Sequence, residues 1–423
     1  MTEQVNTPEL RFPEFKEEWI EYYLGNNAMI KGRLGWKGLK QSEYLNNGYA
    51  YLIANKHIKN GRITWEETDQ INKFRYDESP EIALETGDLI FSKDGALGNP
   101  ALIKNLPKPA SINSTMMLVR LNKNNFIPNF FYQILLGPLF NKLIYLKVSG
   151  SSIPHLFQAD MKDFKFKAPS LPEQEKIGNF FSKLDQQIEL EEKKLKLLEQ
   201  QKRGYMQKIF SQELRFKDES GNDYPEWKER KFSELLSYSS NGVDKKINKN
   251  HDIAYMVNYM DVFNKTKLNT KNRDLLMETT ATKIQKEKNN LKKGDILFTP
   301  SSETREDIAK STVVFEDLDN TVYSYHLIRL RPLDSNIFSL KYSNYLSEQN
   351  FISKQFRRLA QGAQRYTLTK EHFENIRLNL PHITEQEKIG DFFSKLDEVI
   401  NKQSQKIDEL KLRKQGFLQK MFI

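Results

Sequence analysis

The clearest pattern of apolar positions in the chain occurs twice. In residues 173–210 apolar side chains recur at alternating steps of four and three, and residues 385–422 repeat the pattern in the same register. This spacing is that of a heptad seam, a narrow apolar stripe by which one helix faces another. Each segment closely follows a proline, Pro172 or Pro381, and begins with acidic residues, which the helix dipole favours there. The pattern predicts two long helices that pair through Ile177, Phe181, Leu184, Ile188, Leu195, Leu198, Ile389, Phe393, Leu396, Ile400, Ile407 and Leu410.

The two predicted helices are copies of one another. The run EQEKIG stands at residues 173–178 and again at 385–390, and FFSKLD stands at 180–185 and again at 392–397. A Pro-Glu-aromatic-Lys-Glu run repeats at the same offset, at 13–17 and 225–229, whereas similarity between these anchors is faint. Two copies are too few for a solenoid. The chain therefore reads as a duplicated domain, each half a variable globular segment followed by a nearly invariant helix.

The direction of helix pairing follows from one seam position. Lys202 and Lys414 occupy this position in the two copies, and parallel pairing in register would bring their ammonium groups together, which is unfavourable. Antiparallel pairing places them against Leu396 and Leu184 instead, where lysine methylenes can cover leucine while the charge reaches solvent. We therefore expect an antiparallel pair with a two-fold axis, each helix about 57 Å long at ~1.5 Å per residue. Two helices docked independently on other surfaces remain the alternative.

The variable segments combine strand and helix patterns. Short β-rich runs bounded by turn residues predict strands at 49–54, 88–92, 116–121, 295–299 and 325–330, and helical patterns cover 129–147 and 339–359. The predicted fold class is α/β: two mixed α/β domains joined by two long helices in an antiparallel coiled coil, with an internal pseudo-two-fold repeat. The predicted boundaries are a first domain at 1–170, a helix at 171–211, a linker at 212–224, a second domain at 225–380 and a second helix at 381–423.

Composition narrows the class of protein. The 423 residues include no cysteine, which excludes a disulfide scaffold, a cysteine zinc site, an iron–sulfur cluster and a cysteine nucleophile. No apolar run is long enough for a membrane span, and the N-terminus lacks a signal-peptide pattern, so we expect a cytoplasmic protein. The formal net charge of +9 favours a polyanionic partner such as nucleic acid.

Catalytic motifs are missing from the sequence. It contains no Walker loop, no Gly-x-Gly-x-x-Gly run and no Gly-x-Ser-x-Gly elbow. It also lacks any Pro-Pro dipeptide, which an adenine-methylating Asn/Asp-Pro-Pro-aromatic loop requires, and any Pro-Asp dipeptide of a nuclease site. The six histidines show no metal-ligand spacing. We therefore predict a non-catalytic chain with no metal site and no cofactor of its own.

Basic, aromatic and amide residues gather in one region of each variable segment. Arg and Gln can pair bidentately with guanine and adenine edges, and Lys and Arg neutralise phosphates. For each residue a solvated surface loop is the alternative. The candidate DNA-binding residues are Lys31, Arg33, Trp36, Lys37, Lys40, Ser151, Ser152, His155, Arg357, Arg358, Gln361, Gln364, Arg365, Tyr366 and Lys370.

Three motifs together resemble a known family. They are PELRFPEF at residues 8–15 and the helix starts PSLPEQEKI at 169–177 and PHITEQEKI at 381–389. With the variable segment after the first motif, they resemble the specificity subunit of type I restriction–modification enzymes over essentially the whole chain. One departure is that the second ELRF run, at 213–216, is separated from Pro225 by an insertion, which we interpret as a linker.

The resemblance implies a division of labour. Two target recognition domains would each read one half of a bipartite, gapped site in double-stranded DNA, and the paired helices would space them and dock two methyltransferase subunits. Restriction subunits carrying the nuclease and motor would join this assembly. S-adenosylmethionine, ATP and Mg²⁺ would then belong to the partner subunits.

Two other functions stay open at this point. A coiled-coil adaptor that never touches DNA predicts no salt-dependent duplex binding, whereas phosphate contacts make affinity fall steeply with salt. A stand-alone DNA methyltransferase is disfavoured by the missing Pro-Pro loop, and S-adenosylmethionine binding by the isolated chain would revive it.

Overall fold

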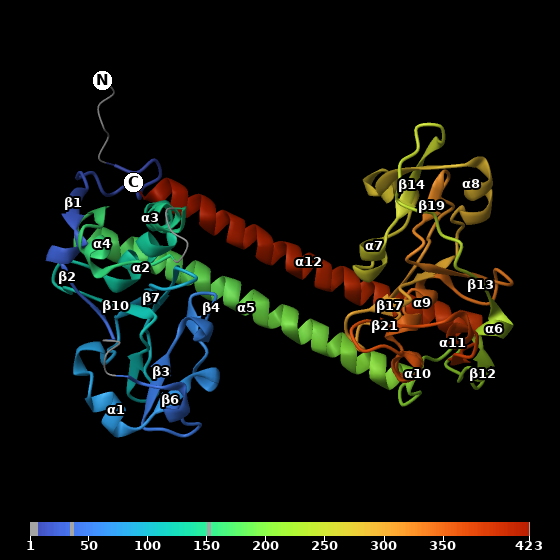
Figure 1. Cartoon of the computed structure of the whole chain (residues 1–423), viewed down its shortest axis with the longest axis horizontal. Coiled ribbons are helices and arrows are strands. Elements are labelled where there is room, and N and C mark those ends of the chain that lie inside the picture. Colours follow the sequence, from blue (N-terminus) through green and yellow to red (C-terminus); the bar gives the residue numbers. More distant parts are fainter. Residues whose placement is uncertain (1–6, 34–37, 150–153, 423) are drawn as a thin grey trace. The chain divides into compact units, whose positions relative to one another are not determined.

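The chain forms two compact units. The fold is taken from a computed structural model that describes residues 7–33, 38–149 and 154–422. The first unit contains residues 1–193 and 405–423, and the second contains residues 194–404. Each unit therefore includes one α/β segment and part of each long helix, α5 (Leu171–Phe210) and α12 (Ile383–Met421) (Figure 1).

The first unit is built around two small sheets. A four-stranded antiparallel sheet has the order β2-β10-β7-β8, and a three-stranded sheet has the order β6-β3-β9, in which β3 and β9 are parallel. Its strands are β1 (Ile20–Tyr23), β2 (Ala28–Gly32), β3 (Ala50–Ile53), β4 (Ile58–Lys59), β5 (Arg62–Ile63), β6 (Asp69–Ile71), β7 (Leu89–Ser92), β8 (Gly98–Leu102), β9 (Ala110–Ile112), β10 (Met116–Leu121) and β11 (Lys165–Ala168). Its shorter helices are α1 (Lys73–Asp77), α2 (Pro128–Leu136), α3 (Pro138–Ser149) and α4 (Gln158–Lys162).

The second unit repeats this topology. Its sheets have the orders β13-β20-β16-β18 and β15-β14-β19, again with one parallel pair, β14 with β19. Its strands are β12 (Lys228–Lys231), β13 (Leu236–Ser239), β14 (Asp252–Val257), β15 (Met277–Ala281), β16 (Ile296–Phe298), β17 (Ser301–Ser302), β18 (Ser311–Val313), β19 (Thr321–Tyr323), β20 (Ile328–Pro332), β21 (Tyr366–Thr367) and β22 (Arg377–Leu380). Its shorter helices are α6 (Phe232–Leu235), α7 (Tyr259–Phe263), α8 (Lys283–Asn289), α9 (Leu340–Ser343), α10 (Asn350–Leu359) and α11 (Lys370–Glu374).

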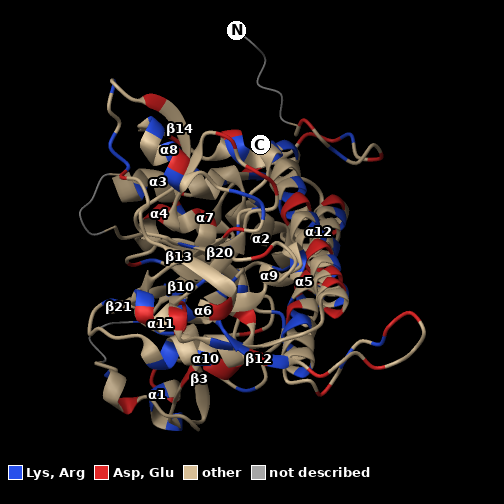
Figure 2. Cartoon of the chain, turned by 90° about the vertical axis from the view of Figure 1, so that its right-hand side faces the viewer, with Lys and Arg blue, Asp and Glu red and all other residues tan. Residues whose placement is uncertain are grey.

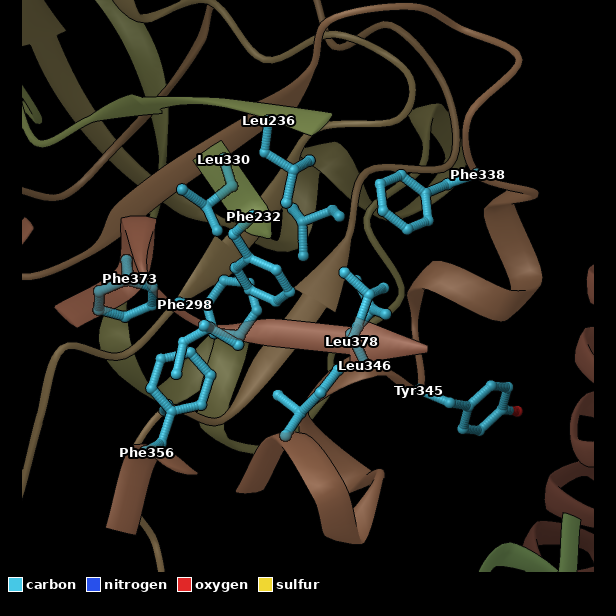
Figure 3. Packing of buried hydrophobic residues seen from close by; sticks show 14 of the residues in the cluster. Phe232, Leu236, Phe298, Leu330, Phe338, Tyr345, Leu346, Phe356, Phe373 and Leu378 are labelled. Carbon is cyan, nitrogen blue, oxygen red and sulfur yellow. The ribbon is translucent and has the colours of Figure 1, made fainter. Parts of the chain in front are cut away.

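The central strands of both units are buried on both faces. Side chains alternate across a strand, so Met117 and Val119 of β10 enter one apolar cluster while Met116 and Leu118 enter another. In the second unit Phe298 of β16 lies in an aromatic cluster with Phe232, Phe356 and Phe373 (Figure 3). Such strands read as continuous apolar runs rather than alternating ones, which is why GDLIF and GDILF are recognisable in both halves.

Two segments predicted as continuous helices are broken. The segment 129–147 divides into α2 and α3 at Gly137, whose ψ of 179° is extended. Gly137 precedes a proline, and the proline ring disfavours helical backbone in the residue before it. The segment 339–359 divides into α9 and α10, with extended backbone at Gln349 (φ −66°, ψ 123°) before the second helix.

The long helices run antiparallel in both units, as the seam predicted. In the first unit Asp185 pairs with Lys414 at 2.7 Å and Glu192 pairs with Lys411 at 2.7 Å. In the second unit Lys202 pairs with Asp397 at 2.7 Å. As residue numbers rise along α5, those of the facing residues on α12 fall.

The predicted seam residues all lie away from solvent. Six are buried and six are half-buried, and the buried ones are Ile177, Phe181, Ile188, Ile389, Phe393 and Ile407. The helix ends also join the domain cores, since Phe181 packs with Phe422 in the first unit and Phe393 packs with Phe210 in the second. The helices therefore pair with each other and close the cores of the units.

One detail of the pairing was predicted wrongly. Lys202 and Lys414 do not bring their charges out to solvent over leucine, because an aspartate follows each facing leucine and takes the ammonium group. Both lysine side chains are only 16–17% exposed. A carboxylate one residue further along α5 or α12 gives the ammonium group a partner of opposite charge within the seam.

Candidate nucleic-acid interface

The repeated helix starts fasten each α/β segment to its long helix. The carboxylate of Glu173 is fully buried and accepts hydrogen bonds from Nε and Nη2 of Arg11, both at 2.7 Å. The equivalent Glu385 accepts from Arg215 at 3.2 and 2.8 Å and from Nε1 of Trp227 at 2.9 Å. Bidentate pairs of this kind are strong, and the bonds to the carboxylates raise the pKa of both arginines.

The glutamine that follows each buried glutamate makes the same three bonds in both units. The side-chain amide nitrogen of Gln174 donates to the carbonyls of Pro169 (2.9 Å) and Asn125 (3.2 Å), and its oxygen accepts from the amide of Ile127 at 3.0 Å. Gln386 makes the equivalent bonds to Pro381, Ile337 and Ser339. The Glu-Gln motif is thus a structural fastener, which explains why it is the most repeated part of the sequence.

A short strand pairing in the second unit creates an ordered surface next to β16. Strand β17 pairs antiparallel with β21 and joins the loop after β16 to the loop before α11. In the first unit a single bridge between Asp94 and His155 stands at the equivalent place, after β7 and before α4. We call this surface the bridge edge: residues 301–305 and 364–367 in the second unit, and residues 93–94 and 155–157 in the first.

Two guanidinium groups are fixed on the bridge edge of the second unit. Nε of Arg365 donates to Oγ of Ser301 at 3.2 Å, and the guanidinium of Arg305 lies 4.9 Å from the centre of the Tyr366 ring. The hydroxyl of Tyr259 donates to the Ser301 carbonyl at 2.9 Å and braces the loop. Arg305 and Arg365 are exposed, and in the part of the chain that the structure describes neither forms an ion pair with a carboxylate.

The bridge edge of the first unit carries different chemistry. Nδ1 of His155 contacts the carboxylate of Asp94, and Nζ of Lys93 lies 2.9 Å from the same carboxylate. The His155 ring lies 4.3 Å from that of Phe157, whose residue is 59% exposed. A carboxylate and an imidazole thus replace the guanidinium groups of the second unit.

The DNA-binding candidates predicted in the first half differ in their exposure to solvent. Lys31 and Lys40 are exposed. Arg33 is buried, and its guanidinium donates to the carbonyl of Ile112 and the hydroxyl of Ser111, both at 3.2 Å. Burial lowers the pKa of Arg33, and its hydrogen bonds give it a structural place inside the unit instead of a surface one. Trp36, Lys37, Ser151 and Ser152 lie outside the described residues.

The second-half candidates gather at the end of α10 and on the loop that leads to α11. Arg358, Gln361, Gln364 and Lys370 are exposed. Arg357 is half-buried and donates to the Glu306 carbonyl at 3.4 Å. The structure thus places the second-half candidates next to the bridge edge, and two of them, Arg365 and Tyr366, are part of that edge.

Sequence reasoning missed Arg305, Tyr259, Lys93 and Asp94. A signal for Asp94 was present, because it stands three residues after the GDLIF run, just as Ser301 stands three residues after the matching GDILF run. The two halves diverge directly after this matched strand, and that divergence marks the loop that forms the bridge edge.

The second unit also contains a charged network around Glu348. The carboxylate of Glu348 lies between Nζ of Lys202, at 3.2 Å, and Nζ of Lys265. Tyr345 extends from the apolar cluster toward α12 (Figure 3), where its hydroxyl donates to Asp397 at 2.7 Å. Burial opposes ionisation of Glu348, but the two ammonium groups outweigh it and lower the pKa of this carboxyl.

The described residues show no arrangement for a metal ion or a membrane span. In residues 7–33, 38–149 and 154–422, no three His, Asp or Glu side chains gather in a way that would hold a metal ion. In the same residues no helix has an apolar stretch long enough to cross a bilayer.

Comparison with known proteins agrees with the doubled architecture. A family model described as the type I restriction modification DNA specificity domain matches the chain twice, at residues 28–200 and 224–412. The specificity subunit of the type I restriction enzyme MjaVIII from Methanocaldococcus jannaschii is 24% identical over 418 residues, which cover 95% of this chain and 91% of that protein.

Solved structures share the fold. An S subunit of a type I restriction–modification system from M. genitalium aligns over 99% of both chains with a TM-score of 0.56 and 14% identity. A chain from a study of complex assembly and conformational transition of the type I system aligns over 95% of this chain and 96% of that one, with a TM-score of 0.58 and 17% identity. With the specificity domain matched in both halves, the chain belongs to the specificity (S) subunits of type I restriction–modification systems, the non-catalytic members of those complexes.

Proposed function

We propose that each unit reads one half of a bipartite, gapped site in duplex DNA. The main support for this proposal is that the two units share one fold but carry different side chains at their bridge edges. The Glu-Gln fasteners and the sheet orders match between the units, whereas the exposed side chains beside β7 and β16 do not. Two readers of different sequences need a shared scaffold and different contact residues. We place the reading domains at residues 1–170 and 225–380, joined to the helices at 171–211 and 381–423 through a linker at 212–224.

We further propose that α5 and α12 dock two methyltransferase subunits, which restriction subunits join. The helices carry Lys, Arg, Asp and Glu closely interspersed along their length (Figure 2), and side chains such as Leu190 and Leu412 are more than 60% exposed. A mixed charged face with isolated apolar side chains suits a protein partner better than a phosphate backbone. S-adenosylmethionine, ATP and Mg²⁺ would be bound by these partners, in the cytoplasm where the DNA lies.

The decisive experiment exchanges one of the two proposed DNA-reading domains. Residues 13–170 are replaced by the variable segment of another specificity subunit, the chain is expressed with its partner subunits, and methylated sites are mapped by sequencing genomic DNA. One half of the recognised site should change while the other half and the gap remain. A change in both halves, or in neither, contradicts the two-reader proposal.

A binding measurement separates this function from that of an adaptor. The assembled complex should bind duplex DNA with an affinity that falls steeply as salt rises, because phosphate contacts release counterions. Binding that is absent, or insensitive to salt, would favour an adaptor that makes no DNA contact.

A further inference from the structure

We infer that the bridge edge holds the base-reading side chains of each unit: Arg305 and Arg365 beside Tyr366 in the second, and Asp94 and His155 in the first. This inference rests on the proposed DNA-reading function. It adds which residues determine the sequence read by each half.

The arginines of the second unit are held in a way that suits base recognition. A guanidinium group presents a planar fork of donors that pairs bidentately with O6 and N7 of guanine. The Tyr366 ring fixes the plane of Arg305, and the Ser301 hydroxyl fixes the Nε side of Arg365. Side chains that are already oriented lose less entropy on binding, and both guanidinium groups keep their remaining donors at the surface.

The charges around this edge divide into two roles. Arg357, Arg358 and Lys370 flank it and can neutralise phosphates. Asp307, in the loop after β17, already accepts from Thr304 at 2.7 Å and pairs with Lys310 at 3.4 Å. Glu303 and Glu306 remain exposed, and a carboxylate can accept from the cytosine amino group. The edge thus offers both donors and acceptors within a basic surround.

The first unit offers a different set of groups at the same place. Asp94 can accept from a cytosine amino group, and His155 can donate or accept according to its tautomer. The helix that leads to this edge differs as well. Tyr145 and Leu146 of α3 are 71% and 58% exposed, whereas Arg357 and Arg358 stand at the equivalent place on α10. The two edges therefore present different chemistry on matching backbones, as readers of two half-sites require.

The same contrast argues against a protein partner at this surface. Two copies of one methyltransferase would dock on equivalent surfaces of the two units, and equivalent docking would keep similar side chains at both places. The two bridge edges instead carry different charged side chains, guanidinium groups in the second unit and a carboxylate with an imidazole in the first. DNA, whose two half-sites differ in sequence, is the partner that explains their divergence.

The experiment maps methylation by the whole complex with paired variants. Once wild-type sites are known, Arg305→Ala with Arg365→Ala should relax base preference at positions of the second unit's half-site, with discrimination falling about tenfold to a hundredfold. Asp94→Ala with His155→Ala should relax positions of the other half-site only. Lys288→Ala, on α8 and well apart from β17 and β21 (Figure 1), is the matched control and should leave every position unchanged.

A conservative double variant separates base reading from charge and from folding. Arg305→Lys with Arg365→Lys keeps both charges but removes the forked donors, so base preference should still relax while overall affinity stays within about threefold. A uniform loss of affinity with unchanged preference would overturn the inference, since it would mean phosphate contact alone. Loss of assembly with the methyltransferase subunits in both double variants would assign the edge to a protein partner. Absence of DNA binding by the wild-type complex would instead overturn the proposed function.

Discussion

The two units of this protein are alike inside and different outside. Buried Glu173 and Glu385, and the glutamines beside them, make matching bonds to their own segments. At the surface, the second unit has the pairing of β17 with β21, next to Arg365, where the first unit has the Asp94–His155 bridge. The buried Glu-Gln motif attaches each segment to its long helix through the same set of hydrogen bonds, so both copies keep it. The surface residues have no such constraint and can diverge.

The hydrogen bonds to the buried glutamate of the Glu-Gln motif differ in one respect between the two copies. The aromatic residue of the repeated Pro-Glu-aromatic run is Phe15 in the first half and Trp227 in the second. Trp227 adds a third donor to Glu385, and among the described residues Glu173 has side-chain donors only from Arg11. This small difference makes the units unequal in their tolerance of change.

The largest expected effect comes from removing the arginines. Arg11→Met leaves a fully buried carboxylate unpaired and should destabilise the first unit by about 3–5 kcal/mol. Arg215→Met should cost the second unit less, about 2–3 kcal/mol, because the Trp227 donor remains. Hydrogen exchange of peptides from each unit measures the two effects separately. Adding Trp227→Phe to Arg215→Met should bring the second unit to the loss seen in the first, and an equal loss without it would show that the third donor contributes nothing.

The next largest change in stability is expected at two glycines where α5 and α12 pack against the α/β segments. A Cβ at Gly390 would lie 2.6 Å from the amide nitrogen of Tyr342, whereas one at Gly178 would lie 3.0 Å from Cβ of Asn129. Alanine gains about 1 kcal/mol of helix propensity over glycine, so Gly178→Ala should be near neutral while Gly390→Ala costs about 1–2 kcal/mol.

Two further glycines of the same helices provide the control. Gly204 and Gly416 have open space around a built Cβ, and their alanine variants should raise stability by about 0.5–1 kcal/mol. Denaturant unfolding gives all four values. A Gly390→Ala variant as stable as Gly204→Ala would contradict the close packing of α12 on α9.

An effect of similar size tests the helix seam in the second unit. Leu198 is half-buried at a predicted seam position, and its neighbour Leu197 is 59% exposed. Leu198→Asp should cost about 1–2 kcal/mol because it places a charge in the seam, and Leu197→Asp should stay within about 0.5 kcal/mol. Thermal unfolding compares the pair, and similar losses from both would mean that the seam does not run through residue 198.

The smallest effect is a pH dependence confined to the second unit. Because the pKa of Glu348 is lowered in the folded protein, its contribution is complete above the ordinary glutamate pKa of ~4.3 and is lost as pH falls through the lower folded-state value. Glu348→Gln should lower the melting temperature by about 2–4 °C at pH 7, and this difference should shrink toward zero in acid. Glu192→Gln, which breaks a partly exposed pair with Lys411, should change little at any pH. A difference that stayed constant from neutral pH into acid would contradict the role of the Glu348 charge.

Part of the interface could be predicted because local sequence encoded it. The cluster around Arg365 was found from its composition alone, and the structure gathers it beside β17. Arg33 shows the limit of that approach. It stands among exposed basic residues in the sequence but turns inward to the carbonyl of Ile112. A basic residue in a loop looks the same whether it meets solvent or a distant backbone carbonyl.

The sequence by itself determined the duplication, the two long helices and their antiparallel pairing. These follow from periodicity and from one charged seam position, both of which are local patterns. Only the tertiary structure decided that Lys202 and Lys414 would find aspartates, that Glu173 would be buried against Arg11, and that loops about 60 residues apart would form each bridge edge. The physical reason is that a hydrogen bond or ion pair between distant residues depends on how sheets and helices bring them within about 3 Å, and no spacing along the chain records that distance.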